Sequence, residues 1–166
     1  MLRTADLLSA HPFLQELPEP WLERLSFQAH PVVRHAGQRL FHEGRSADRF
    51  WLLRSGRVDL DMAVPGRGDV VIETIEAGSV LGWSWLFPPY RWHFGAVPTE
   101  QTFAVEFDAA GVRRLIADDA ELGRDLTNRF MNVLVDRLQA ARIRLTQLYE
   151  LPTRVEPAHM DKEVQQ

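Results

Sequence analysis

The sequence predicts a mainly β fold with added helices: a double-stranded β-helix, or jelly roll, with N-terminal helices and one long C-terminal helix. Two observations carry this prediction. Between residues 31 and 107 the apolar runs are short and separated by glycine-containing turns, at the roughly 8–12-residue spacing typical of rolls and sandwiches. After residue 108 the apolar residues recur every three or four positions, which indicates helices.

The 166 residues have room for one substantial core with an appended element. We therefore expect a single domain, 1–150, followed by a polar tail, 151–166. Within the domain we expect N-terminal helices over residues 4–30, a β-roll over 31–107, and a hinge with the long helix over 108–150.

The N-terminal part predicts two short helices. The first spans residues 4–10, with Thr4 as its cap, and stops at His11 because a residue before proline avoids the helical conformation. The second begins with Pro20 at its first helical position, where a missing N–H costs nothing.

The middle part predicts a series of short strands. Residues 58–62 alternate strictly between apolar and acidic side chains, which favours a strand with Asp59 and Asp61 on its wet face. The segment 65–69, PGRGD, has two glycines and is typical of a hairpin loop. The expected strands cover residues 32–33, 39–41, 49–53, 57–64, 70–75 and 102–107.

Two acidic caps predict the C-terminal helices. Asp108 precedes a short helix over residues 109–117, and Asp118 or Asp119 precedes a long one that runs to about Tyr149. From Leu134 the apolar spacing becomes heptad-like. A helix of about 30 residues is about 45 Å long, more than a small roll covers. We therefore expect this seam to pack on a second copy in a homodimer, with packing wholly on its own roll as the alternative.

Composition narrows the function. The formal net charge of −4 argues against general nucleic-acid binding, and the absence of cysteine excludes disulfides and thiolate metal sites and fits a reducing cytoplasm. We expect no signal peptide and no membrane span, since no apolar run approaches about 18 residues.

Catalytic patterns are also missing. The six histidines form no His-x-His pair, and a triad drawn through Ser84 and His93 has no support from spacing. We therefore expect neither an enzyme nor a metal site, and no cofactor.

Several segments resemble the cyclic-nucleotide-binding domain of the Crp/Fnr (catabolite activator) superfamily. They are AGQRLFHEGRSADRFWLLRSGRVDLDM (36–62), EAGSVLG (76–82) and FAVEFDAAGVRRLIADDAEL (103–122), and the likeness extends over about residues 7–149. It implies a sensor domain with a ligand under the long helix. Family members usually continue into a helix-turn-helix. This chain ends soon after the long helix, so we expect a stand-alone sensor without direct DNA binding.

The resemblance also implies where a ligand would bind. Nucleotide-binding members carry a phosphate-binding cassette with Gly-Glu-x-x-x-Leu and, later, an arginine followed by a small residue. The matching segment here, 82–87, keeps Gly82 but has Trp83 in place of the glutamate. Alignment from the exit strand puts Trp92 and His93 where the arginine and small residue would stand, with Arg91 one position earlier.

Three interpretations of this cassette stay open. It holds a different small ligand, anionic or aromatic; it keeps weak affinity for cyclic AMP or cyclic GMP; or its own side chains fill it, and the protein has a structural or protein-interaction role. Loss of the glutamate leaves a ribose hydroxyl unmatched, which costs about 1–3 kcal/mol. The expected ligand-binding residues are Gly82, Trp83, Ser84, Trp85, Arg91, Trp92, His93 and, from the long helix, Arg142.

Overall fold

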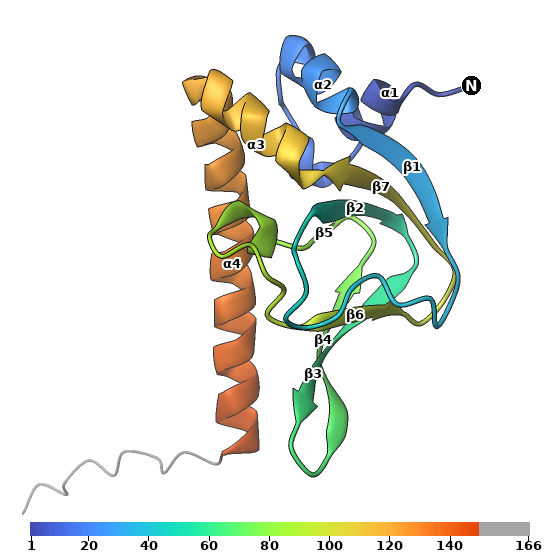
Figure 1. The fold of residues 1–166 in the computed structure, drawn as a ribbon, viewed down its shortest axis with the longest axis vertical. Coiled ribbons are helices and arrows are strands. Elements are labelled where there is room, and N and C mark those ends of the chain that lie inside the picture. Colours follow the sequence, from blue (N-terminus) through green and yellow to red (C-terminus); the bar gives the residue numbers. More distant parts are fainter. Residues whose placement is uncertain (150–166) are drawn as a thin grey trace, which may run out of the picture. The chain divides into compact units, whose positions relative to one another are not determined.

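The computed structural model describes residues 1–149; the predicted tail, 151–166, lies outside the described residues. The chain forms two compact units, Met1–Met131 and a second one that begins at Asn132. The first contains the whole β-roll, the N-terminal helices and the start of the long helix, and the described part of the second is the rest of that helix (Figure 1).

Two antiparallel sheets make up the predicted jelly roll, which confirms the fold class. One has the strand order β1-β7-β2-β5 and the other β4-β3-β6. The strands are β1 (Ala29–Arg34), β2 (Arg49–Ser55), β3 (Arg57–Val64), β4 (Gly68–Glu76), β5 (Val80–Leu81), β6 (Gly95–Pro98) and β7 (Thr102–Asp108). The PGRGD segment joins β3 and β4 as a hairpin, as predicted, with Val64 opposite Gly68.

The strand expected over residues 39–41 is wrong. This segment lies in the loop between β1 and β2, and only Phe41 forms a bridge, to Ala96. The Phe41 side chain nevertheless points into the roll, where it is 6% exposed. A single bridge is enough to hold a segment that is too irregular to pair as a strand.

The predicted wet face of β3 is wrong at Asp61, which is only 6% exposed. Arg39 explains the burial, because its two terminal nitrogens donate to the two Asp61 oxygens at 2.9 and 2.6 Å. A β-bulge between Leu60 and Asp61 changes the register at the same point. Gly95 lies opposite Asp61, and a Cβ there would overlap both members of this ion pair.

The helices begin and end close to the predicted residues. They are α1 (Thr4–Ser9), α2 (Glu19–Ser26), α3 (Ala109–Asp118) and α4 (Ala120–Leu148), with 3-10 turns η1 (Pro12–Leu14) and η2 (Ser84–Leu86). Asp108 and Asp119 cap α3 and α4 by accepting from backbone N–H groups, as predicted. Thr4 is not a cap: Arg3 precedes the first turn, and Asp6 accepts from its backbone N–H. Pro20 occupies the second position of α2 rather than the first.

An aromatic cluster joins one face of the larger sheet to the start of α4. Phe50 stacks on Phe107 at 4.4 Å and on Trp85 at 4.5 Å, and Phe130 closes the cluster edge-on. Trp85 and Phe130 are 0% and 1% exposed. Because Trp85 belongs to η2, this cluster fixes that turn to the sheet. Among residues 1–149, no helix combines the length and apolar character needed to cross a membrane.

Candidate functional site

The cassette begins where β5 ends. Gly82 has φ of +95°, a conformation that favours glycine, and it leads into η2. A Cβ at this position would lie 2.9 Å from Cη2 of Trp92, so the ring and the glycine backbone are in close contact. Gly82 is therefore needed both for its backbone angle and for the space it leaves.

Trp92 fills the interior of the roll beside Gly82. It is 3% exposed, and its ring stacks on Phe41 with centroids 3.8 Å apart and planes 14° apart. Trp51 lies next to this pair, 6.1 Å from the Trp92 ring. The protein's own indole thus occupies the position that the alignment gave to a phosphate-binding arginine.

Trp85 is likewise part of the core. Its Nε1 donates to the Gly82 carbonyl at 3.2 Å, and its ring belongs to the aromatic cluster described above. Of the predicted site residues, Trp85 and Trp92 therefore anchor the cassette from beneath.

Three predicted residues come together at the cassette surface. Trp83 stacks on the exposed ring of His93 with centroids 5.0 Å apart. The buried Ser84 hydroxyl lies 3.0 Å from Nδ1 of His93. When the hydroxyl donates to Nδ1, the ring proton is on Nε2, which is then a donor to an incoming group.

Arg91 points toward the β1–β2 loop, residues 35–48. Its Nη1 donates to the Gly44 carbonyl at 3.0 Å, and the residue itself is exposed. Backbone bonds reinforce the connection, since Trp92 donates to Arg45 and accepts from Gly44. Arg142 is an exposed residue of the second unit and is described with that unit alone.

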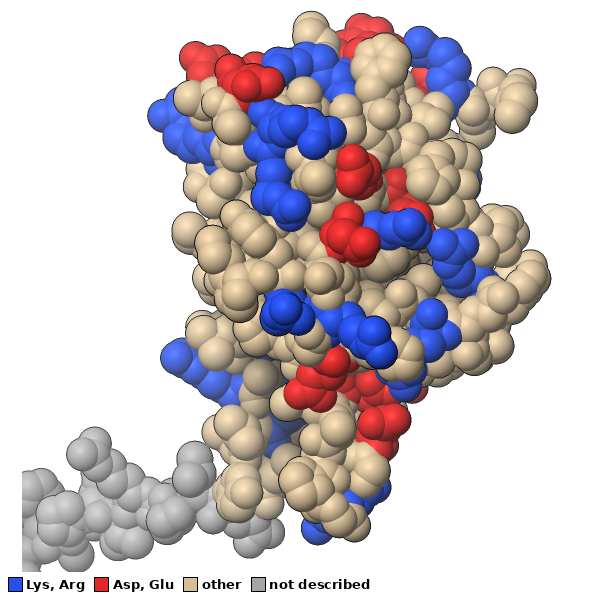
Figure 2. Space-filling model, in the orientation of Figure 1, with Lys and Arg blue, Asp and Glu red and all other residues tan. Residues whose placement is uncertain are grey.

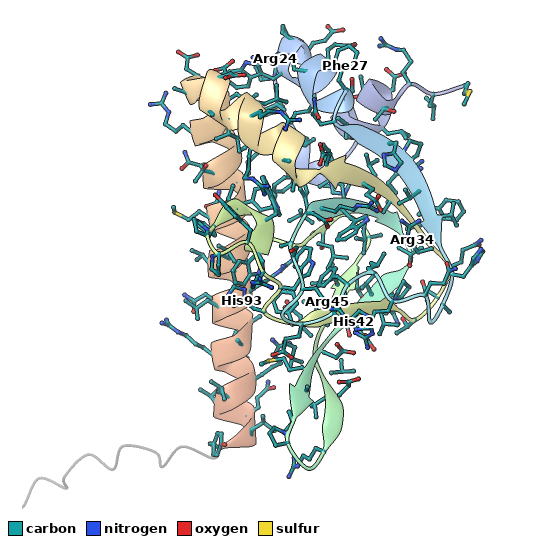
Figure 3. All side chains as sticks on the ribbon, viewed as in Figure 1. Arg24, Phe27, Arg34, His42, Arg45 and His93 are labelled. Atoms are coloured by element: carbon teal, nitrogen blue, oxygen red, sulfur yellow. The ribbon has the colours of Figure 1, made fainter. Side chains whose placement is uncertain are left out.

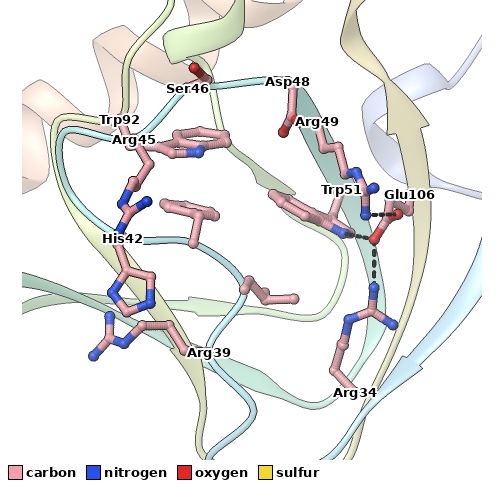
Figure 4. Close-up of a pocket in the computed structure, with 12 residues that line it drawn as sticks. Arg34, Arg39, His42, Arg45, Ser46, Asp48, Arg49, Trp51, Trp92 and Glu106 are labelled. Carbon is pink, nitrogen blue, oxygen red and sulfur yellow. Dashed lines mark hydrogen bonds and ion pairs between the residues drawn. The ribbon is translucent and has the colours of Figure 1, made fainter.

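A second feature was missed by the sequence analysis: a pocket of about 470 Å³ at the mouth of the roll (Figure 4). Its lining residues are Arg34, Arg39, Leu40, Phe41, His42, Arg45, Ser46, Asp48, Arg49, Trp51, Trp92 and Glu106. We call it the arginine pocket. Two signals pointed to it: four arginines fall between residues 34 and 49, and one glutamate, Glu106, interrupts an otherwise apolar strand.

Glu106 organises one wall of the arginine pocket. It is 2% exposed and accepts from Arg34 at 2.8 Å, Arg49 at 2.9 Å and Trp51 Nε1 at 2.8 Å. A buried carboxylate is tolerated only with such partners. On the opposite wall, the hydrogen bonds that Arg39 donates to Asp61 raise the pKa of Arg39 above its usual value.

Within residues 1–149, no three histidine or acidic side chains converge on a point that would hold a metal ion. The contacts seen at the two sites are ring stacking, hydrogen bonds and ion pairs.

The chain is similar to known proteins both in sequence and in fold. The model of the cyclic nucleotide-binding domain family matches residues 31–119. A curated relative, the CRP-like cAMP-activated global transcriptional regulator of Mycobacterium tuberculosis H37Rv, is 25% identical over 152 residues. That match covers 90% of this chain and 66% of the relative's length.

Two solved structures share the fold. A cyclic nucleotide-binding domain from Methylobacillus flagellatus has a TM-score of 0.74 at 16% identity, covering 92% of this chain and 85% of its own. The catabolite activator protein of Thermus thermophilus has a TM-score of 0.65 at 22% identity, covering 82% and 62%.

Proposed function

The chain belongs to the cyclic nucleotide-binding domain family, and we propose that it is a Crp/Fnr-type sensor whose cassette is altered for a small ligand other than a cyclic nucleotide. The family is one of regulatory domains rather than enzymes. The proposal therefore concerns binding and signalling.

The packing of Trp92 carries this proposal. Where nucleotide-binding relatives place an arginine for the cyclic phosphate, this chain has an indole stacked on Phe41 and buried against Gly82. Trp83 replaces the glutamate that would accept from the ribose. A cyclic nucleotide would lose a charge-assisted contact and a hydrogen bond, each worth roughly 1–3 kcal/mol.

The groups that remain accessible suggest what replaces the nucleotide. Trp83 is half-buried and stacked on His93, so a flat ligand could extend this stack. His93 would contribute a hydrogen bond through Nε2, with Ser84 fixing its ring. We infer a small aromatic molecule that carries an acceptor or a negative charge.

Two other interpretations have their own support. Arg91 spends one of its five N–H donors on the Gly44 carbonyl, and the others would be available to a weakly held cyclic phosphate. The buried Trp92 equally suits a closed cassette with a purely structural or protein-interaction role.

We propose that the signal passes through a homodimer formed by α4. In the second unit Leu138, Leu145 and Leu148 are 51%, 53% and 78% exposed on one heptad-like seam. A second copy of the helix would bury this apolar stripe. Ligand binding would shift the cassette and the segment 108–119, and so change the angle between the two helices.

The dimer is tested by substitution in the seam. Leu138→Glu with Leu145→Glu places charges in the proposed interface, and sedimentation velocity should show a monomer. Val71→Glu, which adds the same charge to an exposed residue of β4, should leave a dimer intact. A dimer that persists in the double variant rejects the seam as its interface.

Calorimetry and thermal shift separate the three interpretations of the cassette. We expect no stabilisation by cyclic AMP or cyclic GMP at millimolar concentration, because a ligand stabilises only when its concentration exceeds its Kd. A panel of aromatic carboxylates and phosphates should give a hit that Trp83→Ala abolishes. A thermal shift with a cyclic nucleotide that Arg91→Ala removes favours the weak nucleotide site instead. If neither the cyclic nucleotides nor the aromatic panel gives binding, the closed module is favoured.

A further inference from the structure

The arginine pocket lies beside the cassette but is a separate cavity. Trp92 is shared, since its ring contacts Gly82 and also lines the pocket, whereas Gly82, Trp83, Ser84 and His93 are not among the lining residues. The lining comes from β1, the 35–48 loop, β2 and β7. Figure 2 shows arginine side chains around a hollow on this face, with acidic side chains interspersed.

One wall presents arginines whose positions are already fixed. Arg34 uses one terminal nitrogen on Glu106 and the other on the Val33 carbonyl, and Arg49 uses one terminal nitrogen on Glu106. A guanidinium has five N–H donors, so donors remain on both residues. Because Glu106 is buried behind them, it orients the two cations without filling the cavity.

The opposite wall contains two polar side chains that have no partner among residues 1–149. Arg45 and His42 are exposed, and neither side chain forms a hydrogen bond or an ion pair with another group in residues 1–149. Figures 3 and 4 show both residues on the 35–48 loop, on the side of the pocket away from Arg34. An anion between the walls would receive donors from both.

The charge of the lining selects an anion. It contains four arginines against two carboxylates, Asp48 and Glu106, a formal charge of +2 with His42 neutral. Asp61 compensates Arg39 from outside the lining and reduces the local charge to +1. Paired guanidinium groups in a concave, partly dry site are the arrangement that recognises phosphate and carboxylate oxygens.

The floor is apolar and limits the ligand further. Phe41, Trp51 and Trp92 lie at the base of the cavity, each 6% exposed or less, together with Leu40. A volume of about 470 Å³ is within the range of small-molecule sites. We propose that the arginine pocket is a second ligand site, distinct from the cassette, for a small phosphorylated molecule with a flat or apolar part.

A ligand bound in the arginine pocket would change the position of residues in the cassette. The 35–48 loop and the cassette exchange backbone hydrogen bonds, Gly44 donating to Trp92 at 2.8 Å and Trp92 to Arg45 at 2.9 Å. A ligand that draws Arg45 inward therefore acts on the segment between η2 and β6, which contains Trp92 and His93. The second site would modulate the first through this connection.

The test uses the full chain with three probes: inorganic phosphate, pyrophosphate and phenyl phosphate, at constant ionic strength. Calorimetry gives the affinity, and the indole ¹H–¹⁵N signal of Trp51, whose Nε1 bonds Glu106, gives the location. We expect saturable binding, tightest for phenyl phosphate, with a shift of the Trp51 signal.

Arg45→Gln and His42→Gln are suitable variants because both side chains are exposed and carry no interaction that the fold needs. Arg45→Gln should weaken phenyl phosphate about tenfold, the usual worth of a charge-assisted hydrogen bond. Arg67→Gln makes the same charge change in the β3–β4 hairpin, away from the pocket, and should leave the affinity unchanged. Trp83→Ala should also leave it unchanged, which keeps this test separate from that of the cassette.

Three results would overturn the proposal. One is the absence of saturable binding at tens of millimolar of every probe. Another is equal weakening by Arg45→Gln and Arg67→Gln, which indicates non-specific charge attraction. The third is loss of phenyl phosphate binding in Trp83→Ala with full retention in Arg45→Gln, which places the ligand in the cassette.

Discussion

The cassette and the arginine pocket share one wall, the indole of Trp92, but different chemistry surrounds it. On the cassette side the accessible groups are Trp83 and His93, an aromatic pair positioned by one hydrogen bond from Ser84. On the pocket side the ring is bordered by arginines, two of which are held by the buried Glu106. The cassette therefore offers mainly stacking, and the arginine pocket offers mainly positive charge above an apolar floor.

The difference separates two things that a nucleotide-binding cassette usually combines. A cyclic nucleotide needs an apolar face for its base and a cation for its phosphate, close together. In this chain the accessible aromatic pair is at the cassette, while the arginines lie beyond Trp92, above an apolar floor of buried side chains. This separation favours two different ligands over one nucleotide, and each prediction below tests one part of it.

The largest effect is expected at Glu106, which holds the charged side together. Glu106→Ala leaves Arg34, Arg49 and the Trp51 N–H without their acceptor and should lower the free energy of unfolding by about 3 to 4 kcal/mol. Urea unfolding followed by fluorescence measures the loss. The arginines are partly exposed and can turn to water, which keeps the value below the upper limit for a buried pair.

A matched control is available on the surface. Glu76 pairs with Arg57 at 3.5 Å, and both side chains are more than half exposed. Glu76→Ala should change the free energy of unfolding by less than about 0.5 kcal/mol. Equal losses in the two variants would contradict the view that Glu106 is the organising residue of the pocket.

A smaller effect is expected on the cassette side, at Gly82. Gly82→Ala places a Cβ against Trp92 at a φ of +95°, and it should cost about 2 to 3 kcal/mol from backbone strain and overpacking together. Gly37→Ala is the control, because its φ of +82° is similar but nothing lies within 4 Å of the added Cβ. It should cost about 1 kcal/mol in the same denaturation experiment.

The gap between these two variants reports how tightly Trp92 closes on the cassette. If Gly82→Ala costs no more than Gly37→Ala, the indole can move aside. The space beneath the cassette would then be open to a ligand, and the contrast between the two sides of Trp92 would disappear.

The two sites also differ in how far the sequence could predict them. The cassette is contiguous, so the pattern from Gly82 to His93 located it. The arginine pocket instead brings residues 34–49 together with Glu106, which is distant in the sequence, so no contiguous pattern located it. The direction of the side chains could not be predicted from the sequence at either site. In the cassette, Arg91, Trp92 and His93 face outward, inward and outward in turn. An alignment error of one residue therefore exchanges the inward and outward faces.

The fold was more predictable than the site because many of its features depend only on residues that are close in the sequence. The β3–β4 hairpin and the caps of α3 and α4 depend on neighbouring residues, and their predictions are confirmed. The burial of Asp61 depends on Arg39, which lies 22 positions earlier in the chain. Long-range ion pairs of this kind decide which charged residues are inside, and no local pattern shows them.

His11 is a buried ionisable residue that, unlike Glu106, has no oppositely charged partner in the described part of the chain. His11 is 4% exposed; its Nε2 lies 2.9 Å from the Leu53 carbonyl, and its Nδ1 accepts from the Phe13 N–H. Burial lowers the pKa of His11 below its ordinary value of about 6.5. The folded state therefore prefers the neutral ring, and its stability falls as the pH drops below 6.5.

The expected slope is at most about 1.4 kcal/mol per pH unit, for the uptake of one proton on unfolding. Urea unfolding between pH 7.5 and about 5 measures it. His11→Gln should be less stable at neutral pH but should lack most of the slope, whereas His35→Gln, at an exposed position, should retain it. A slope that persists in His11→Gln assigns the titration to another group.

The smallest effect is expected at Ser84, where a single hydrogen bond positions the ring of His93. Ser84→Ala removes the 3.0 Å contact to His93 and should cost about 0.5 to 1 kcal/mol of stability, against about 3 to 4 for Glu106→Ala. Thr74→Ala, which removes an exposed hydroxyl bonded to Asp59, is the control and should be nearly neutral.

The effect of Ser84→Ala on ligand binding should exceed its effect on stability, because His93 would no longer be fixed against Trp83. Affinity for the aromatic ligand identified in the cassette screen should fall about tenfold in Ser84→Ala, while phenyl phosphate binding in the arginine pocket stays unchanged. If both affinities fall together, the two sides of Trp92 form one site, and the separation of stacking from charge proposed here is wrong.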